Sequence, residues 1–161
     1  MSEFCLISFF EISGQNNICI IVTHMKAREA FEAIRFVQMK QILEHLNSES
    51  FLNLYKDKFK CKGMLFCGDF NTEPTSESIK LIENYKHSEN LFLNSFAGEE
   101  ITTYKIRDKV YARVIDYIWN NGFDLTTKNK LMNKLEIGEL GLPSFSFPSD
   151  HLFLKAGFKI K

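Results

Sequence analysis

An α/β fold, in which helices pack against a β-sheet, is the class that this sequence predicts. Short apolar runs rich in β-branched and aromatic residues have the length of strands and lie at 4–12, 18–22, 62–68, 114–119 and 152–160. Two stretches, 29–46 and 75–85, have helical features and lie between these runs. Strands that alternate with helices indicate a layered α/β architecture. Because the chain has only three prolines and no linker-like segment, residues 1–161 are expected to form one unit.

The first two runs predict a β-hairpin, since polar turn residues at 13–17 connect them. The stretch 29–46 contains no helix breaker. Within it, Phe36, Met39, Leu43 and Leu46 recur at spacings of three and four residues. This spacing predicts a helix with one buried face.

The later elements are predicted from their boundaries. The run 62–68 predicts a short, fully buried strand that ends at a glycine. Pro74 lies just before Thr75-Ser76, which predicts the start of a helix that continues to about Tyr85. The strand at 114–119 is expected to end in a turn at 120–122, and 142–148 is expected to be an irregular loop before the last strand.

Charge limits the function classes that this chain can belong to. Twenty Lys and Arg residues balance twenty Asp and Glu residues, which gives a formal charge of zero. Binding of nucleic acid through bulk positive charge is therefore excluded, and any recognition of phosphate must be local. The sequence predicts a site and not an extended basic patch.

Cysteine usage and apolar segments bear on the compartment. The four cysteines form no CxxC pair and no zinc-module spacing, which favours reduced, structural thiols: Cys5, Cys19, Cys61 and Cys67. The start of the chain lacks a basic signal region, and no apolar run reaches membrane-spanning length. We expect a cytoplasmic protein that does not enter a membrane. A transit peptide on a longer parent chain would make it mitochondrial.

The segment 67–74 is the most informative for chemistry. Residues two apart in an extended chain face the same way, so Asp69 and Asn71 are expected to project together while Phe70 points into the core. The carboxylate can take a proton from water, and the amide can donate to a phosphate oxygen. On its own, this pattern is also typical of an Asp/Asn turn after a strand.

Three other polar groups strengthen the functional interpretation. His24 and Lys26 lie two apart at the end of an apolar strand. Asp116 interrupts the apolar run 114–119 and needs a partner, because a lone buried carboxylate is costly. The pair 150–151 adds an adjacent carboxylate and imidazole. Four such groups in one short α/β chain predict a convergent polar site.

The order of these motifs resembles the later motifs of the endonuclease/exonuclease/phosphatase superfamily. The motifs are Thr-His-x-Lys at 23–26, Gly-Asp-Phe-Asn at 68–71, Ile-Asp-Tyr-Ile-Trp at 115–119 and Ser-Asp-His at 149–151. The longer stretches 23–28, 68–74 and 102–107 are most similar to the nocturnin-like branch, with deadenylases and Angel-type proteins next. Tyr104 stands where that branch usually has a tryptophan. The resemblance covers nearly the whole chain.

The resemblance implies part of a DNase I-like fold, a four-layer sandwich of two packed mixed β-sheets flanked by helices, with the amino-terminal half absent. It also implies roles for the polar residues. Asp69 would orient or deprotonate the attacking water, and Asn71 would bind the phosphate or Asp69. Asp116 would hydrogen-bond one nitrogen of His151 and leave the other nitrogen for the phosphate. His24 would contact a phosphate oxygen.

Cofactor and ligand contacts are implied in the same way. Mg²⁺, or alternatively Mn²⁺, would be held by Asp150, directly or through water, with Asp69 and Asn71 as further metal contacts. Lys26, Arg28 and Arg107 would supply positive charge for a phosphorylated ligand. For Arg28, a solvated surface charge is an equally good interpretation. Tyr104 would stack on a base or pack in the core.

The resemblance starts midway through the family domain, and family members are about twice as long. The missing amino-terminal half would normally supply the glutamate that binds Mg²⁺ most directly. Glu3 and Glu11 are the only acids before His24, and neither lies in the expected motif. Half a sandwich would leave an apolar sheet face exposed. We therefore expect either a piece of a longer protein or a piece that a partner chain completes.

The implied activity is a Mg²⁺-dependent phosphoester hydrolase. The nocturnin-like motifs suggest removal of the 2′-phosphate of NADP(H), and the deadenylase-like motifs suggest 3′-to-5′ cleavage of poly(A) RNA. The alternative is a catalytically incomplete remnant that binds a nucleotide or a protein.

Overall fold

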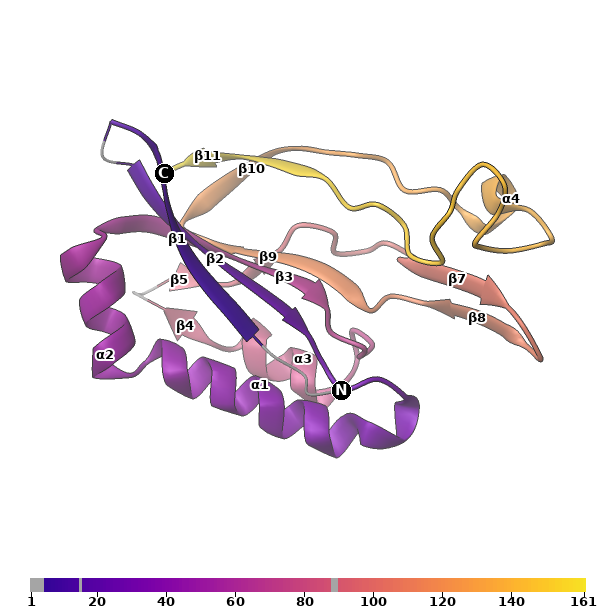
Figure 1. Cartoon of the computed structure of the whole chain (residues 1–161), viewed down its shortest axis with the longest axis horizontal. Helices are drawn as coiled ribbons and strands as arrows, with labels where there is room; N and C mark the ends of the chain where they lie inside the picture. Colours follow the sequence, from indigo (N-terminus) through magenta and orange to yellow (C-terminus); the bar gives the residue numbers. More distant parts are fainter. Residues whose placement is uncertain (1–4, 15, 88–89) are drawn as a thin grey trace.

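A computed structural model describes residues 5–14, 16–87 and 90–161. Its centre is a five-stranded mixed β-sheet with the strand order β1-β2-β3-β9-β6 (Figure 1). β2 and β3 are parallel, and the other neighbours in this sheet are antiparallel. The strands are β1 (Cys5–Ser13), β2 (Asn16–His24), β3 (Cys61–Asp69), β9 (Asp116–Asn121) and β6 (Leu93–Asn94).

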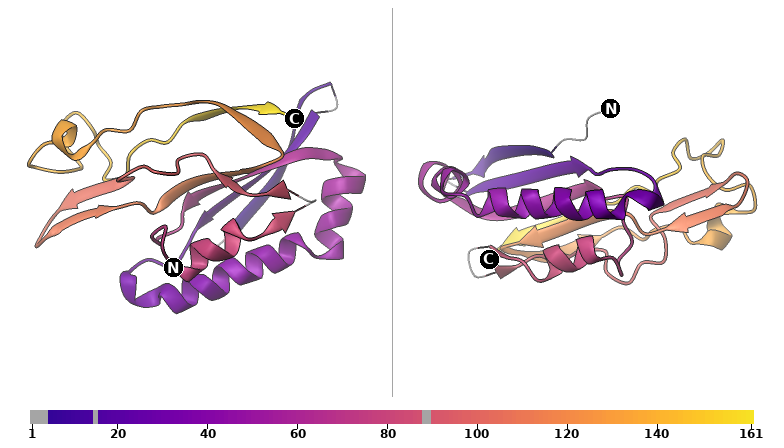
Figure 2. Two further views of the ribbon diagram at one scale, coloured as in Figure 1. Left: turned by 180° about the vertical axis from the view of Figure 1, so that it is seen from behind. Right: turned by 90° about the horizontal axis from the view of Figure 1, so that it is seen from below.

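The remaining elements are helices and three two-stranded sheets. The helical segments are η1 (Glu29–Phe31), α1 (Glu32–Leu46), α2 (Glu49–Leu52), the π-helical η2 (Asn53–Lys58), α3 (Glu77–Glu83) and α4 (Lys134–Ile137). The small sheets pair β4 (Lys86–His87) with β5 (Asn90–Leu91), β7 (Thr103–Ile106) with β8 (Val110–Arg113), and β10 (Phe123–Lys128) with β11 (Ala156–Ile160). The β7–β8 hairpin and α4 project together at one end of the molecule (Figures 1 and 2).

Most of the predicted elements are present. The hairpin is formed by β1 and β2, although Phe4 lies outside the described residues. The predicted helix at 29–46 consists of η1 and α1, and Ser76 caps α3 by accepting a hydrogen bond from the backbone of Ile79. The last strand is shorter than expected, because regular pairing with β10 begins only at Ala156.

The helices cover one face of the sheet and form the main core with it. α1 and α3 pack against the side of the sheet that carries Cys19, Ile21, Phe66 and Trp119. The predicted buried face of α1 needs one correction. Phe36 is only half-buried, and Arg35 is the residue that is buried together with Met39, Leu43 and Leu46.

A smaller second core joins the five-stranded sheet to the segments after β9. Ile118 of β9 and Ala156 of β11 pack against it, and its fully buried members are Phe96, Ile101, Tyr104, Leu131, Leu142 and Leu152. The predicted turn at 120–122 reduces to Gly122, because both asparagines continue β9. Asn120 donates to the carbonyl of Leu93 and Asn121 to the carbonyl of Asn90, so each side chain ties a neighbouring segment to β9.

The outer face of β1 and β2, opposite the helices, is uncovered. Four of its apolar side chains remain between 45% and 59% exposed: Leu6, Phe10, Ile12 and Val22. Within the described residues, β1 pairs only with β2, so its other edge is open. β1 carries no lysine, arginine or proline, the residues that commonly protect an edge strand from pairing.

The four cysteines are free thiols and lie on β1, β2 and β3. Burial raises the pKa of Cys5, Cys61 and Cys67 to about 11 and that of Cys19 to about 12. The thiols are therefore protonated at neutral pH, as the sequence suggested for structural cysteines. Among the described residues, no helix is long and apolar enough to cross a membrane.

Candidate active site

Three of the predicted site residues lie side by side in one row across the central sheet. His24 of β2 pairs with Asp69 of β3, and Asp69 pairs with Asp116 of β9. The row depends on close approach of β2 and β3 at Gly68, which has a φ of +143°. A Cβ atom there would lie 1.9 Å from the carbonyl oxygen of Thr23, so only glycine fits.

His151 joins this row from the distant loop before β11. An isolated bridge pairs His151 with Thr103 at the start of β7. Nδ1 of His151 then lies 3.0 Å from both carboxylate oxygens of Asp116. The hydroxyl of Thr102 also donates to Asp116 at 2.7 Å. Asp116 therefore has the partner that its position required, and the pair fixes the orientation of the imidazole.

The pKa values of this group are shifted by their neighbours. The hydrogen bond with Asp116 raises the pKa of His151 above its ordinary value, although burial opposes this shift. Burial and the nearby Asp116 raise the pKa of Asp69. Nε2 of His151 lies 4.0 Å from Asp69 Oδ2, and Nε2 of His24 lies 3.5 Å from the same oxygen. Two imidazoles thus face one carboxylate whose proton affinity is increased.

Asn71 closes the other side of Asp69. Its backbone N–H donates to Asp69 Oδ1 at 2.8 Å, and its Nδ2 donates to the carbonyl of Met25 at 3.1 Å. Asn71 has a φ of +51°, a left-handed conformation that asparagine tolerates better than most residues. Phe70 is fully buried, as expected, so the turn directs Asp69 and Asn71 away from the core.

A cavity of about 590 Å³ opens above these residues. Its lining includes Asp69, Asn71, His24 and His151, together with cations from the β7–β8 hairpin. Lys105 is paired with Asp150, and Arg113 is paired with Glu73. Within the described residues, three cations of this cavity make no ion pair: Arg28, Arg107 and Lys109. The cavity therefore combines an acid–base group with free positive charge, as a phosphorylated ligand requires.

Three predicted residues are not placed in this cavity. Asp150 accepts a hydrogen bond from Lys105 at 2.8 Å, which lowers the pKa of Asp150, and it is not among the lining residues. Lys26 lies outside the lining, and its Nζ is 5.4 Å from the ring of Phe31. Tyr104 is buried in the second core, where it has no open face for a base. The core interpretation of Tyr104 was the correct one.

Sequence reasoning missed several cavity residues. Lys105, Lys109, Tyr111 and Arg113 all come from β7, β8 and their turn. The alternation of charged residues with apolar or aromatic ones between Tyr104 and Arg113 was the available signal for this hairpin. Glu11 lies at the far end of β1, opposite Asn17, and is remote from the row that contains His24. Glu3 lies outside the described residues.

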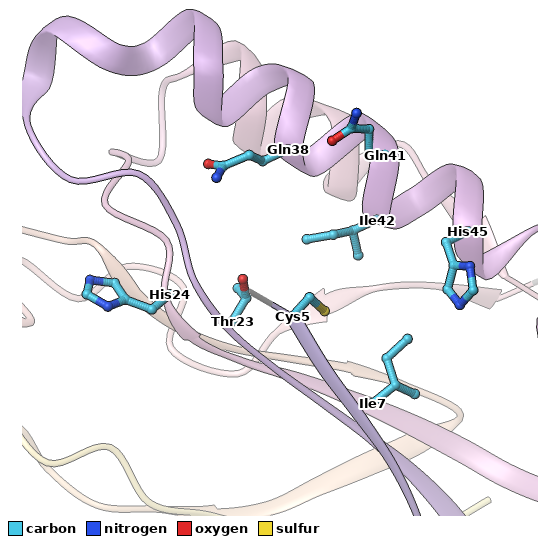
Figure 3. Close-up of a pocket in the computed structure, with 8 residues that line it drawn as sticks. All are labelled: Cys5, Ile7, Thr23, His24, Gln38, Gln41, Ile42 and His45. Carbon is cyan, nitrogen blue, oxygen red and sulfur yellow. The ribbon is translucent and has the colours of Figure 1, made fainter. Parts of the chain in front are cut away.

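A second cavity of about 360 Å³ lies beside the first, between the open edge of β1 and α1 (Figure 3). His24 borders both cavities. The other side chains that line the second cavity carry thiol, apolar, hydroxyl, amide and imidazole groups: Cys5, Ile7, Thr23, Gln38, Gln41, Ile42 and His45. Among the described residues, the second cavity is lined by no carboxylate, whereas Asp69 lines the first. The first cavity is therefore the candidate active site.

The donor set of the first cavity can be compared with what a divalent cation needs. Asp69, Asp116 and His151 offer possible ligand atoms within 4.8 Å of one another. The carboxylate of Asp116 is already hydrogen-bonded to His151 and Thr102. Asp69 Oδ2 and the amide oxygen of Asn71 are therefore better placed to bind a cation. Mg²⁺ is commonly held by one or two protein oxygens, with water and phosphate completing the shell. The residues present fit such a cation.

Comparison with known proteins gives a consistent result. The model of the endonuclease/exonuclease/phosphatase family matches residues 12–151. Nocturnin of Rattus norvegicus is 36% identical over 154 residues, which cover 87% of this chain and 33% of that protein. A probable CCR4-Not complex 3′-5′-exoribonuclease subunit Ccr4 of Enterocytozoon bieneusi is 28% identical over 177 residues, covering 97% of this chain and 35% of that protein.

The solved structure of the human nocturnin catalytic domain with a bound sulfate anion shares the fold. It has a TM-score of 0.74 and 25% identity, and the match covers all of this chain and 54% of that one. The predicted DNase I-like architecture is therefore confirmed. The chain spans about a third of the length of the curated relatives and about half of the solved domain.

Proposed function

The chain belongs to the endonuclease/exonuclease/phosphatase family, and on that premise we propose that its cavity hydrolyses phosphoesters with the help of Mg²⁺. The row of His24, Asp69 and Asp116, completed by His151, is the observation that carries the proposal. This group places a base and an imidazole acid beside unpaired cations in one cavity.

Asp69 acts as the base in this proposal. A carboxylate with a raised pKa takes a proton from water more readily, and the N–H of Asn71 holds Asp69 Oδ1 so that Oδ2 faces the cavity. His151 is protonated more readily because of Asp116, and its Nε2–H donates to a phosphate oxygen. Asp116 orients His151 and stabilises its charged form.

Mg²⁺ would be held by Asp69 and Asn71, and it would supply positive charge that stabilises the phosphate oxygens. Asp150, the other proposed metal contact, would first have to leave Lys105. The metal contact of Asp150 is therefore the weakest part of the proposed site.

For the substrate, we propose a small phosphorylated nucleotide, NADP(H), ahead of poly(A) RNA. The cavity volume of about 590 Å³ lies in the range of about 300–1,000 Å³ that is usual for small-molecule sites. Zero net charge also favours a local contact over a long basic track. Similarity to Ccr4, whose name denotes an exoribonuclease, keeps RNA as the competing substrate.

The test measures phosphate release from NADPH and, in parallel, shortening of an oligoadenylate by the purified chain in Mg²⁺. Asp69→Asn and His151→Gln are expected to lower either activity by at least about 100-fold, the usual contribution of a positioned acid or base. Asp124→Asn is the control, because Asp124 is exposed on β10 and lies outside the cavity. Activity that survives Asp69→Asn would refute the proposed base.

The alternative function is a remnant that binds a nucleotide or protein without turnover. The observation behind this alternative is that the match covers only 54% of the solved nocturnin domain, so this chain alone supplies part of the family's site. Phosphate or nucleotide binding without any product from folded protein would support the remnant. Mg²⁺ binding that Asp69→Asn weakens would support the enzyme.

A partner surface is part of the same proposal. The uncovered face of β1 and β2 runs from Ile12 through Val22 to the row that holds His24, so it borders the cavity. We propose that the remaining part of a family domain covers this face, since nearly half of the human nocturnin domain has no counterpart here. Its β-strand would pair with the open edge of β1.

Co-expression with the unmatched portion of rat nocturnin tests this surface. A complex is expected that Leu6→Asp or Phe10→Asp disrupts. Leu135→Asp, on the exposed α4, is the control and should leave the complex intact. Absence of a complex, or a complex that tolerates all three changes, would contradict the proposal.

A further inference from the structure

Arg35 is a charged side chain in the main core. It connects α1 to the loop between β2 and α1 and, through Glu32, to the loop after β3. It is 2% exposed and lies on the buried face of α1, between η1 and Met39. A buried guanidinium is costly unless its donors are satisfied. Three hydrogen bonds of Arg35 end on the loop between β2 and α1, and a fourth ends on Glu32 at the start of α1.

Arg35 contacts three backbone carbonyl groups of that loop. Nη1 donates to the carbonyl oxygens of Lys26 at 2.8 Å and Arg28 at 2.7 Å, and Nη2 donates to that of Glu29 at 3.3 Å. Nε donates to Glu32 at 3.0 Å. Gln38, one turn further along α1, accepts from the backbone N–H of Lys26. The first half of α1 therefore holds the loop on both its carbonyl and its amide side.

Glu32 extends this connection to the loop after β3. It accepts from the hydroxyl of Thr72 at 2.8 Å and from that of Ser78 at 2.6 Å. Burial alone would raise the pKa of Glu32, but hydrogen bonds from Ser78, Thr72 and Arg35 hold this pKa below its usual value. Thr72 directly follows Asn71, so one ion pair connects both loops that line the cavity.

Arg28 has a backbone conformation that needs such support. Its φ of 78° and ψ of 140° lie in a region that side chains other than glycine rarely adopt. Residues in such regions persist only when their surroundings hold them there, and they cluster at functional sites. The carbonyl of Arg28 is held by Arg35, while its side chain lines the cavity.

We propose that Arg35, acting with Glu32, is a positioning residue that holds the 26–29 loop so that Arg28 faces the phosphate of the ligand. Arg35 does not touch the ligand. The inference rests on the proposed function, because it takes Arg28 to be an anion contact.

The experiment compares Arg35→Met with wild type by two independent measurements. Met keeps the apolar stem and removes all five donors. Lys40→Met is the matched control on the same helix, where Lys40 is exposed and pairs with Glu44. Amide hydrogen exchange at 26–31 is expected to be at least tenfold faster in Arg35→Met and unchanged in Lys40→Met. Exchange in the second half of α1 should change in neither variant.

Titration with inorganic phosphate, followed by NMR, provides the second measurement. Arg35→Met and Arg28→Ala are each expected to weaken phosphate binding about fivefold or more, and the double variant should be no weaker than either single variant. Such non-additivity identifies residues that act as one unit. Additive losses, or unchanged affinity in a merely less stable Arg35→Met protein, would overturn the positioning role.

The two proposals fail in different ways. If wild type binds no phosphate, the proposed function is refuted, and exchange at 26–31 still decides whether Arg35 holds the loop. If Arg35→Met does not fold, Arg35→Lys takes its place. Lysine keeps the charge near Glu32 but cannot reach three carbonyls, so the loop should still exchange faster than in wild type. Exchange at the wild-type rate in the folded variant would reject the inference.

Discussion

Replacing Asp116 by asparagine should destabilise the protein more at low pH than at high pH. Asp116 accepts hydrogen bonds from His151 at 3.0 Å and from Thr102 at 2.7 Å. Asparagine keeps the shape of the side chain but removes its charge and can accept at only one oxygen. One of the two bonds is therefore lost, and the imidazolium of His151 loses its counter-ion.

The direction of the pH effect follows from the raised pKa of His151. A histidine whose folded pKa lies above the unfolded value of about 6.5 gives stability that is fully present below pH 6.5. This stability is lost as the pH rises through the folded pKa. Asp69 and Asp150 also face His151 and add to the shift, but the hydrogen bond with Asp116 is its largest cause.

The magnitude can be worked from the lost bond. A hydrogen bond to a charged group contributes about 1.5–3 kcal/mol, and one between neutral groups contributes about 0.5–1.5 kcal/mol. Asp116→Asn should therefore lower the free energy of unfolding by about 2 kcal/mol at pH 6 and by about 1 kcal/mol at pH 9. With a urea m-value of about 2 kcal/mol/M, the midpoint falls by about 1 M and about 0.5 M.

Urea unfolding at pH 6 and pH 9 measures this difference. Asp124→Asn is the control, because Asp124 is 63% exposed and 3.6 Å from Lys161. That variant should lose little at either pH. An Asp116→Asn loss that is equal at the two pH values, or larger at pH 9, would refute the assigned role of the His151 charge. NMR titration of His151 should also show a lower pKa in the variant.

Two further predictions concern the core. His87 is 1% exposed, neither ring nitrogen has a hydrogen-bond partner in the described part of the chain, and burial lowers its pKa to about 4. A lowered histidine pKa costs stability as the pH falls from 6.5 to about 4, by at most about 3.4 kcal/mol at 1.36 kcal/mol per pH unit. His87→Phe should remove this acid sensitivity in urea unfolding, and an unchanged pH profile would contradict it. Gly68→Ala should cost about 3 kcal/mol or more in thermal or urea unfolding, because its Cβ would lie 1.9 Å from the carbonyl of Thr23. A variant as stable as wild type would show that β2 and β3 can separate at this point.

Sequence patterns predicted the parts of the fold that depend on local periodicity. The hairpin, α1, β3 and α3 have long apolar repeats or clear boundary residues, and each appears close to its expected limits. The convergence of the polar residues could also be predicted, because His24 and Asp69 were expected at strand ends; Asp116 was expected inside the strand 114–119, whereas β9 begins at this residue. Parallel pairing of β2 with β3 then aligns their ends in one row.

The remainder depends on tertiary contacts that no local pattern encodes. Strands of two to four residues, such as β6 and β7, are too short to have a period. Arg35 lies four residues before Met39 and so has the spacing of the buried face, but its charge argues against burial, and the carbonyls of the 26–29 loop explain it. The pairing of Asp150 with Lys105 joins residues 45 positions apart, so no local pattern could predict it.

The protonated thiols of the central sheet can report which strands of the sheet separate when the protein begins to unfold. Thiol reagents react with the thiolate, which is the nucleophile. Because their pKa values are about 11 to 12, the four thiols are nearly unreactive while the sheet is intact: Cys5, Cys19, Cys61 and Cys67. Cys5 and Cys19 lie on the hairpin, whereas Cys61 and Cys67 lie at opposite ends of β3. The order in which the four become modified under mild denaturant would therefore map which strands separate first, with no cysteine introduced into the chain.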